Sequence, residues 1–141
     1  MADIIYNRFL YNLLEKLVDL GSGGDTINVA LLDNTYSPNK DHNVWADVSA
    51  KEISGTGYTA GGAALANQAV TQDDANDKAK WDADDQTWSN ATITARYAII
   101  RDVTLDCLIC CFDLGSDKSS EANDFTIQWH TDGILNLAQG A

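Results

Sequence analysis

The chain is poor in basic residues and in proline, and it has few cysteines. Nine Lys and Arg face 21 Asp and Glu among 141 residues, which gives a formal net charge of −12. Because so acidic a surface repels the phosphates of nucleic acids and of anionic lipids, we expect no nucleic-acid partner and no membrane partner. One proline, ten glycines and a hydrophobic share of 45% are typical of a globular protein rather than a collagen-like or disordered chain. The length predicts a single folding unit.

Long apolar runs are also absent. None approaches the roughly 20 residues that a membrane-spanning helix needs. The first residues lack the charged start and the cleavage site of a secretory signal. We therefore expect the chain to be made and kept in the cytoplasm.

The three cysteines, Cys107, Cys110 and Cys111, are crowded into one short stretch, and an odd number so placed is not a disulfide framework. If the stretch is a strand, Cys107 and Cys111 point to one face and Cys110 to the other, so the three sulfurs cannot surround one metal ion. We expect reduced, buried thiols and no metal site.

The residue types that usually carry catalysis form no familiar pattern. His42 and His130 have no nucleophile and orienting acid at a known spacing, and GxSxG, HExxH and Walker sequences are absent. Residues 21–24 (GSGG) lack the Lys-Ser/Thr pair of a phosphate loop and indicate a hinge. We expect no enzymatic activity and no cofactor.

Two other kinds of site stay open. Carboxylates are dense between Asp73 and Asp85, but a calcium loop that began at Asp73 would have Ala75 and Lys78 where it needs an oxygen ligand and a glycine. A solvated acidic face is therefore favoured over a cation site. A sugar could stack on the four tryptophans if the fold brought them together; these are Trp45, Trp81, Trp88 and Trp129.

Residues 3–20 show the period of an amphipathic helix. Asp3 is placed to cap its amino end, Lys16 lies near the carboxyl end, where the helix dipole favours a cation, and Gly21 can end the helix. The apolar stripe either packs on the chain's own strands or docks on a neighbouring subunit, and both alternatives stay open. Its large side chains are Tyr6, Phe9, Leu10, Leu13, Leu14, Leu17 and Leu20.

After Gly24 the apolar period becomes two, which is typical of strands with one wet face. The alternation predicts strands at 27–31, 92–99 and 125–130. The run 105–112 is apolar on nearly both faces and predicts a central strand under a covering layer. Shorter strands are predicted at 51–54, 63–67, 79–81 and 134–137, and polar connections at 33–41, 54–62, 72–77, 82–90 and 115–124.

One helix followed by short strands, with no second helix for βαβ crossovers, predicts a mainly β fold. We expect an antiparallel β-sandwich or a jelly-roll-like barrel with one N-terminal amphipathic helix. Residues 1–24 would form the helix and the Gly-rich hinge, and residues 25–141 the β-sandwich domain. The two parts would make a single folding unit.

Four segments form a distinctive combination: 52–62 (EISGTGYTAGG), 83–88 (ADDQTW), 93–98 (ITARYA), and 125–129 (FTIQW) followed by GIL at 133–135. In this order they resemble a family of small virion proteins of tailed bacteriophages, the head-decoration or cement group. The resemblance covers residues 27–137 and the opening helix.

The resemblance implies a structural protein without catalytic residues. Such a protein is made in the host cytoplasm, binds the major capsid protein on the outer surface of the virion and stabilises the head. It also implies a homo-oligomer, for which a trimer is a common arrangement. Related small β proteins serve instead as tail-associated or head-fibre modules that bind a receptor or a glycan, and this alternative stays open.

The same segments have structural interpretations. The glycines at 55, 57, 61 and 62 permit turns with positive φ around Tyr58. Tyr97 is expected to extend the core, while Arg96 faces outward, available to a carboxylate on a neighbour. We expect the helix stripe and the 33–47 segment to contact the capsid. The predicted contact residues are Tyr6, Phe9, Leu10, Leu13, Leu14, Leu17, Tyr36, Pro38 and Trp45.

Overall fold

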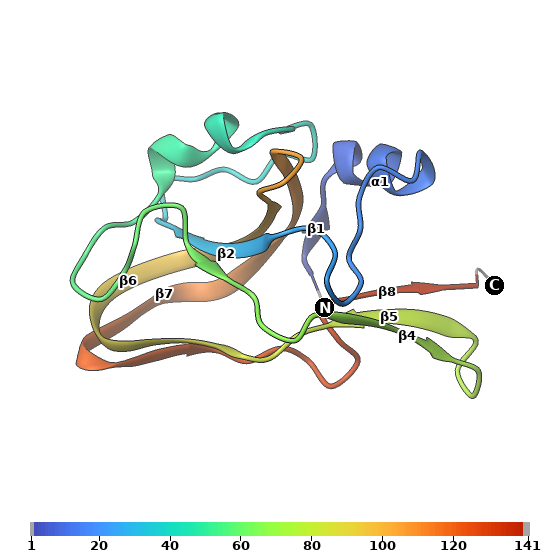
Figure 1. The fold of residues 1–141 in the computed structure, drawn as a ribbon. Helices are drawn as coiled ribbons and strands as arrows, with labels where there is room; N and C mark the ends of the chain where they lie inside the picture. The colour runs from blue at the N-terminus through green and yellow to red at the C-terminus, as the bar shows by residue number, and fades with distance from the viewer. Residues whose placement is uncertain (1, 140–141) are drawn as a thin grey trace.

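The computed structural model describes residues 2–139 (Figure 1). Within this range the protein has antiparallel sheets and one α-helix near the N-terminus, which confirms the predicted mainly β class. The elements are β1 (Ile4–Ile5), α1 (Asn7–Leu14), β2 (Ile27–Leu32), the 3-10 helices η1 (Trp45–Asp47) and η2 (Ser49–Lys51), β3 (Ala63–Ala64), β4 (Ala69–Asp73), β5 (Lys78–Asp82), β6 (Gln86–Asp102), β7 (Cys107–Ile127) and β8 (Leu135–Ala138).

The strands form two sheets. The larger has the order β1-β7-β6-β2-β3, and the smaller has the order β4-β5-β8. The smaller sheet lies beside one end of the larger, below α1 in Figure 1. Trp81 and Leu135 of the smaller sheet belong to the same buried cluster as Ile100 and Ile109 of the larger. The two sheets therefore share a core in a sandwich-like arrangement.

The pairing of β6 with β7 is longer than the sequence pattern predicts. The two strands have 17 and 21 residues. The expectation of connections at 82–90 and 115–124 is wrong for most of those residues, because cross-strand hydroxyl pairs hold the polar ends together. Thr94 Oγ1 and Ser119 Oγ, for example, lie 2.7 Å apart. Polar sequence here marks a wet face, not a turn.

Other strand predictions have mixed outcomes. Residues 107–111 are buried throughout, which confirms a central strand covered on both faces. Strands near 27–31, 79–81 and 134–137 are also confirmed. Residues 51–54 are not a strand, because η2 takes up the start of this stretch and a single bridge, from Glu52 to Leu32, follows it.

Helix α1 begins later than predicted. Ile4 and Ile5 form β1 instead and pair with the edge of β7. Asp3 does not cap the helix, since its carboxylate accepts the backbone N–H of Asp113 at 2.6 Å. Two β-branched residues gain ladder hydrogen bonds at this edge, a non-local benefit that a helical period cannot reveal.

Helix α1 also ends earlier than predicted, at Leu14. Lys16 has a left-handed φ of 61°, so it makes the turn that ends the helix, which was expected at Gly21. The segment that follows is not a free hinge. The Nε2 group of Gln68 donates to three backbone carbonyls between residues 20 and 25, over 3.0–3.4 Å. The turn is therefore held by the residue that directly precedes β4 of the smaller sheet.

The glycine-rich turn around Tyr58 forms as predicted. All four of its glycines have positive φ, and Gly62 approaches Val29 so closely that a Cβ would strike the Val29 carbonyl oxygen. The Tyr58 hydroxyl donates to Glu52 at 2.8 Å and accepts the N–H of Leu31 at 3.0 Å. The turn is therefore fastened to β2.

Candidate docking groove

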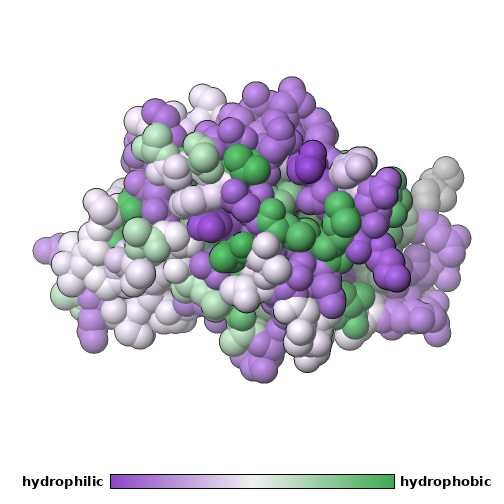
Figure 2. All heavy atoms as spheres, turned by 45° about the horizontal axis from the view of Figure 1, so that its top comes forward, coloured by the Kyte–Doolittle hydropathy of each residue, from purple (hydrophilic) through white to green (hydrophobic). Residues whose placement is uncertain are grey.

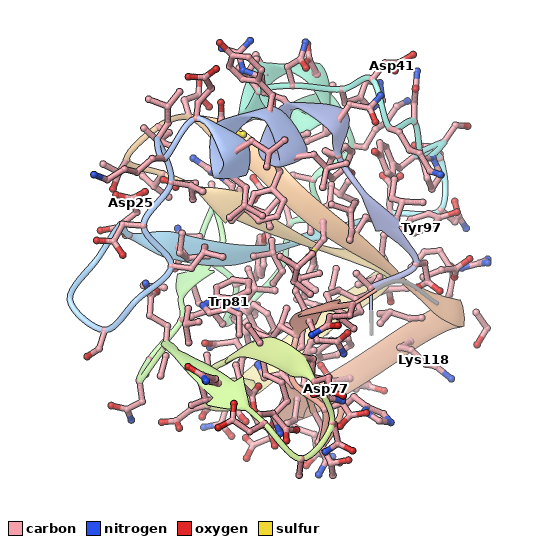
Figure 3. The ribbon with its side chains drawn as sticks, turned by 90° about the vertical axis from the view of Figure 1, so that its right-hand side faces the viewer. Asp25, Asp41, Asp77, Trp81, Tyr97 and Lys118 are labelled. Atoms are coloured by element: carbon pink, nitrogen blue, oxygen red, sulfur yellow. The ribbon has the colours of Figure 1, made fainter. Side chains whose placement is uncertain are left out.

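An open groove of about 520 Å³ separates α1 from the smaller sheet. Figure 3 looks at this side, with α1 above, the smaller sheet below and Trp81 between them. Figure 2 shows apolar side chains gathered on the side of the molecule that carries α1. We call this feature the apolar groove, and its apolar lining is Ile5, Phe9, Leu10, Leu13, Val18, Leu20, Val70, Ala79, Trp81, Leu135 and Leu137.

Several apolar side chains of the groove and of α1 are largely uncovered. Leu137 is 69% exposed and Val70 53%, and Leu14 on α1 is 89% exposed. Phe9, in contrast, is 3% exposed and packs into the core. Scattered exposed leucines are ordinary, but a contiguous apolar group is typical of an interaction surface. The helix stripe thus packs in part on its own sheet and leaves the rest open.

Strand register builds the floor of the groove. Val70 of β4 lies opposite Trp81 of β5, and Trp81 lies opposite Leu135 of β8. Directly opposite residues share a face, so the three side chains form one row. Ala79 and Leu137 form the next row on the same face. The alternation of the three short strands is what turns these apolar side chains toward α1.

The lysines of the smaller sheet are already paired. Lys78 Nζ lies 3.1 Å from the Asp132 carboxylate, and Lys80 Nζ lies 3.8 Å from that of Asp73. Hydrogen bonds from Asn76 hold the pKa of Asp73 below its ordinary value, and the bond from Lys78 does the same for the pKa of Asp132. Both lysines are therefore neutralised within the chain, and the β4–β5 turn stays negative.

Two predicted contact residues lie in the interior. Tyr6 is fully buried and Tyr36 is 4% exposed, and their hydroxyl oxygens lie 2.8 Å apart. Their interpretation as partner contacts is wrong, because each ring fills the second buried cluster beside Tyr97. Phe9 is likewise buried, although one side of it lines the groove.

The remaining predicted contacts lie at the surface. Leu10 and Leu13 line the groove, and Leu17 is half exposed in the segment after α1. Pro38 is exposed in the 33–47 segment. Trp45 is half-buried, with the guanidinium carbon of Arg101 4.4 Å from its ring centre. Of the predicted helix contacts, the groove brings together Phe9, Leu10 and Leu13. Leu17 instead lines a second cavity, and neither Pro38 nor Trp45 lines either one. The sequence analysis missed the floor residues Val70 and Leu137.

Arg96 is not available to a neighbour as predicted. Its Nε and Nη2 groups bind the Asp113 carboxylate at 2.8 and 3.1 Å. In the pairing of β6 with β7, Asp113 lies opposite Tyr97, and the register shift between Ala95 and Tyr97 falls at Arg96. Tyr97 is buried, which confirms its predicted place in the core.

A second cavity, of about 430 Å³, lies between α1, the 43–47 segment and the turn before β7. Asn12 is 4% exposed there and donates from Nδ2 to Cys107 Sγ at 3.1 Å. Among the described residues nothing donates to its Oδ1.

All three cysteines are free and buried. Burial raises the pKa of Cys107, and it raises that of Cys111 to about 12, so these thiols stay protonated.

Asp102 is a buried carboxyl group that the sequence pattern did not signal. It is completely covered, and its Oδ1 accepts the N–H of Leu105 at 2.9 Å. Burial raises its pKa to about 7, and the nearby carboxyl of Asp25 acts in the same direction. Asp25 in turn accepts the N–H of Asp19, a groove residue, at 2.9 Å. This pair links the groove wall to the β6–β7 turn.

The tryptophans do not gather on one exposed face. Trp81, Trp88 and Trp129 are buried, and Trp88 packs edge-on against Phe125. Only the half-buried Trp45 shows more of its ring to solvent. The buried three contribute to the core, which removes the predicted basis for a stacking platform.

Both histidines have hydrogen-bond partners within the described residues. His42 Nδ1 lies 3.2 Å from the Tyr36 hydroxyl, and His130 Nδ1 accepts the N–H of Asp132 at 3.0 Å. Across residues 2–139, no three His, Cys, Asp or Glu side chains are placed to hold a metal ion together. In the same range, no helix combines the length and hydrophobicity required to cross a membrane.

We compared the chain with protein-family models, with curated proteins and with solved structures, and no match was found.

Proposed function

We propose that this chain is a non-enzymatic decoration protein of a tailed-phage head, bound to the major capsid protein on the outside of the virion. The observation that carries the proposal is the apolar groove, whose lining residues Leu137 and Val70 are left largely exposed. The sequence resemblance of residues 27–137 to head-decoration proteins supports the same role. A β body with an open apolar groove is suited to docking.

The energetics fit a protein that acts by binding. Full burial of a Leu or Val side chain contributes about 1.5–3 kcal/mol, so a few groove residues can anchor each copy. A protein that binds only the mature lattice stabilises it by about 2.7 kcal/mol per site at a free concentration of 100 times Kd. Many copies on one head therefore add up to a large resistance to rupture.

The charge supports a place outside the shell. With a net charge of −12, the chain is repelled by packaged DNA and stays well solvated at the outer surface. A homo-oligomer, such as a trimer, is part of the proposal, since decoration proteins commonly bind at symmetric lattice points.

Cryo-electron microscopy of purified virions tests this proposal. We expect density for the chain at regular positions on the outside of the head. We also expect heads that lack it to release DNA at a lower temperature, and added protein to restore their resistance. Absence from the head would overturn the proposal, and density at the tail together with binding on a glycan array would favour the receptor-binding module instead.

A further inference from the structure

We propose that the apolar groove binds a short apolar segment of a capsid subunit that carries lysine or arginine beside its apolar residues. This inference rests on the proposed function and names the chemistry of the partner at that surface. It depends on the shape of the groove and on the distribution of charge around it.

The groove has room for a segment but not for a domain. Its volume of about 520 Å³ lies within the range of about 300–1,000 Å³ typical of concave binding sites. Its floor, with Val70 and Leu137 largely exposed, is apolar and rests on three hydrogen-bonded strands. A partner chain that inserts a few aliphatic side chains between α1 and this floor would cover them.

The charges at the groove favour a basic partner. Lys80 also lines the groove, but it and Lys78 are both held by carboxylates of the same chain. Asp74 and Asp77 are exposed in the β4–β5 turn, and Figure 3 shows Asp77 in the lower part of this face. Asp19 lines the opposite side. Basic residues next to the apolar ones would meet this unpaired negative charge, which gives orientation and a faster association rate.

A second copy of this chain is a poorer occupant. A symmetric contact places the same patch of each copy face to face. Each copy carries a net charge of −12, and its acidic turn would then approach the acidic surface of the other. Like-charge juxtaposition opposes such a pair, while a basic segment gains from the same field.

Two synthetic peptides with one apolar centre test the charge preference. The peptides are acetyl-KKLAVLKK-amide and acetyl-EELAVLEE-amide, and their binding to the full chain is measured by calorimetry. We expect the lysine peptide to bind at least about tenfold more tightly in low salt, with a ratio that shrinks at about 1 M salt, where the screening length is about 3 Å. Equal affinities in low salt would overturn the inference.

Matched variants test the location. Leu137→Asp and, separately, Val70→Asp should weaken binding of the lysine peptide at least about tenfold, because both side chains lie on the groove floor. Val103→Asp is the control, since Val103 is exposed outside the groove. Variants of the floor that bind like the parent chain would contradict the assignment.

A second pair of variants tests the charge. Asp77→Asn should reduce the ratio of the two peptide affinities, and Glu121→Gln, at another exposed site, should leave that ratio unchanged.

Two further measurements separate this inference from the proposed function. If the chain binds heads and Leu137→Asp binds them equally well, the groove assignment fails while head decoration stands. If the lysine peptide binds in the groove and virions lack the chain, head decoration fails, and with it the capsid origin of the segment.

Analytical ultracentrifugation tests the alternative occupant. A dimer that Leu137→Asp abolishes and Val103→Asp preserves would identify a second copy as the occupant and overturn the inference.

Discussion

The hydroxyl oxygens of Tyr6 and Tyr36 lie 2.8 Å apart inside the protein and join the residue that precedes α1 to the segment that follows β2. Tyr36 also lies 3.2 Å from His42 Nδ1. Burial is the main cause of the raised pKa of both tyrosines, so both hydroxyls remain protonated and can donate. The first prediction follows from this pair.

Replacement of Tyr6 by Phe removes one hydroxyl and leaves the ring in place. We expect a loss of about 0.5–1.5 kcal/mol in the free energy of unfolding, the usual net contribution of one hydrogen bond. Urea denaturation measures it. Tyr11→Phe is the matched control, because Tyr11 is 53% exposed, and it should change stability little. Equal effects of the two substitutions would contradict the assigned role of the pair.

Phe9 and Leu14 belong to the same predicted stripe but should respond differently to truncation. Phe9 is 3% exposed and Leu14 is 89% exposed. We expect Phe9→Ala to cost about 3–5 kcal/mol and Leu14→Ala to stay within about 0.5 kcal/mol. Thermal and denaturant unfolding measure both. A large loss from Leu14→Ala would show that this side chain is covered in solution.

Gly62 and Gly23 both have positive φ, but only Gly62 lacks room for a methyl group. A Cβ on Gly23 would meet nothing within 4 Å, whereas one on Gly62 would strike the Val29 carbonyl. We expect Gly23→Ala to cost about 1–2 kcal/mol from the backbone alone and Gly62→Ala to cost about 1–3 kcal/mol more. Chemical denaturation compares the two. Similar costs would mean that the turn shifts freely away from β2.

Stability should fall as the pH rises from about 4 to about 7 because of Asp102. Burial raises its pKa from 3.8 to about 7, so the folded chain favours the neutral carboxyl. The stabilisation from Asp102 is fully present below the pKa that this group has in the unfolded chain, and it is lost as the pH rises through the pKa that it has in the folded chain. Asp102→Asn keeps a neutral group there and should flatten this part of the profile.

Denaturation across pH 4–8 provides the measurement for Asp102. The lowered pKa values of Asp73, Asp113 and Asp132 act with the opposite sign, since their stabilisation is lost as pH falls below about 4. Asp113→Asn should therefore alter the acid limb and leave the slope between 4 and 7 unchanged. An Asp102→Asn chain that keeps the parental slope would refute the assignment to this carboxyl.

The three buried thiols should resist modification in the folded protein. Burial raises the pKa of each, to about 12 for Cys111, and the reactive thiolate is scarce at pH 8. Ellman's reagent should detect no thiol in the native chain and all three in denaturant. Ser119→Cys, on the exposed part of β7, is the positive control. Rapid native labelling without that substitution would indicate that β7 opens.

Several structural features followed from local patterns. Alternation located β2, the continuous apolar run at 105–112 predicted the buried strand at 107–111, and the glycines around Tyr58 predicted the tight turn. These signals depend on near neighbours along the chain. The β1 pairing of Ile4 and Ile5 was missed because it depends on an edge more than 100 positions away in sequence. The hydroxyl pair of Thr94 and Ser119 was missed because its two residues lie 25 positions apart and meet only through the pairing of β6 with β7.

In the groove, too, local patterns predicted some residues and missed those that depend on distant pairing. The helical period identified Leu10 and Leu13, which line the groove, but it could not tell which side of α1 the protein would cover. Asn12, which lies outside the predicted apolar stripe, is buried beside Cys107, while Leu14, which belongs to the stripe, is exposed. Val70 and Leu137 came from strands too short to show a period, and only the pairing through β5 places them on one floor.

The larger sheet ends on both sides in strands of two residues, β1 and β3. Open strand edges invite neighbouring chains to add on by backbone hydrogen bonds. The end strand β1 covers β7 only at Cys110 and Cys111, so the long remainder of β7 up to Ile127 has no strand of the described chain on that side. When this protein is concentrated during expression, that part of β7 is where a neighbouring chain would add, and its charged side chains, such as Lys118 and Glu121, oppose such growth.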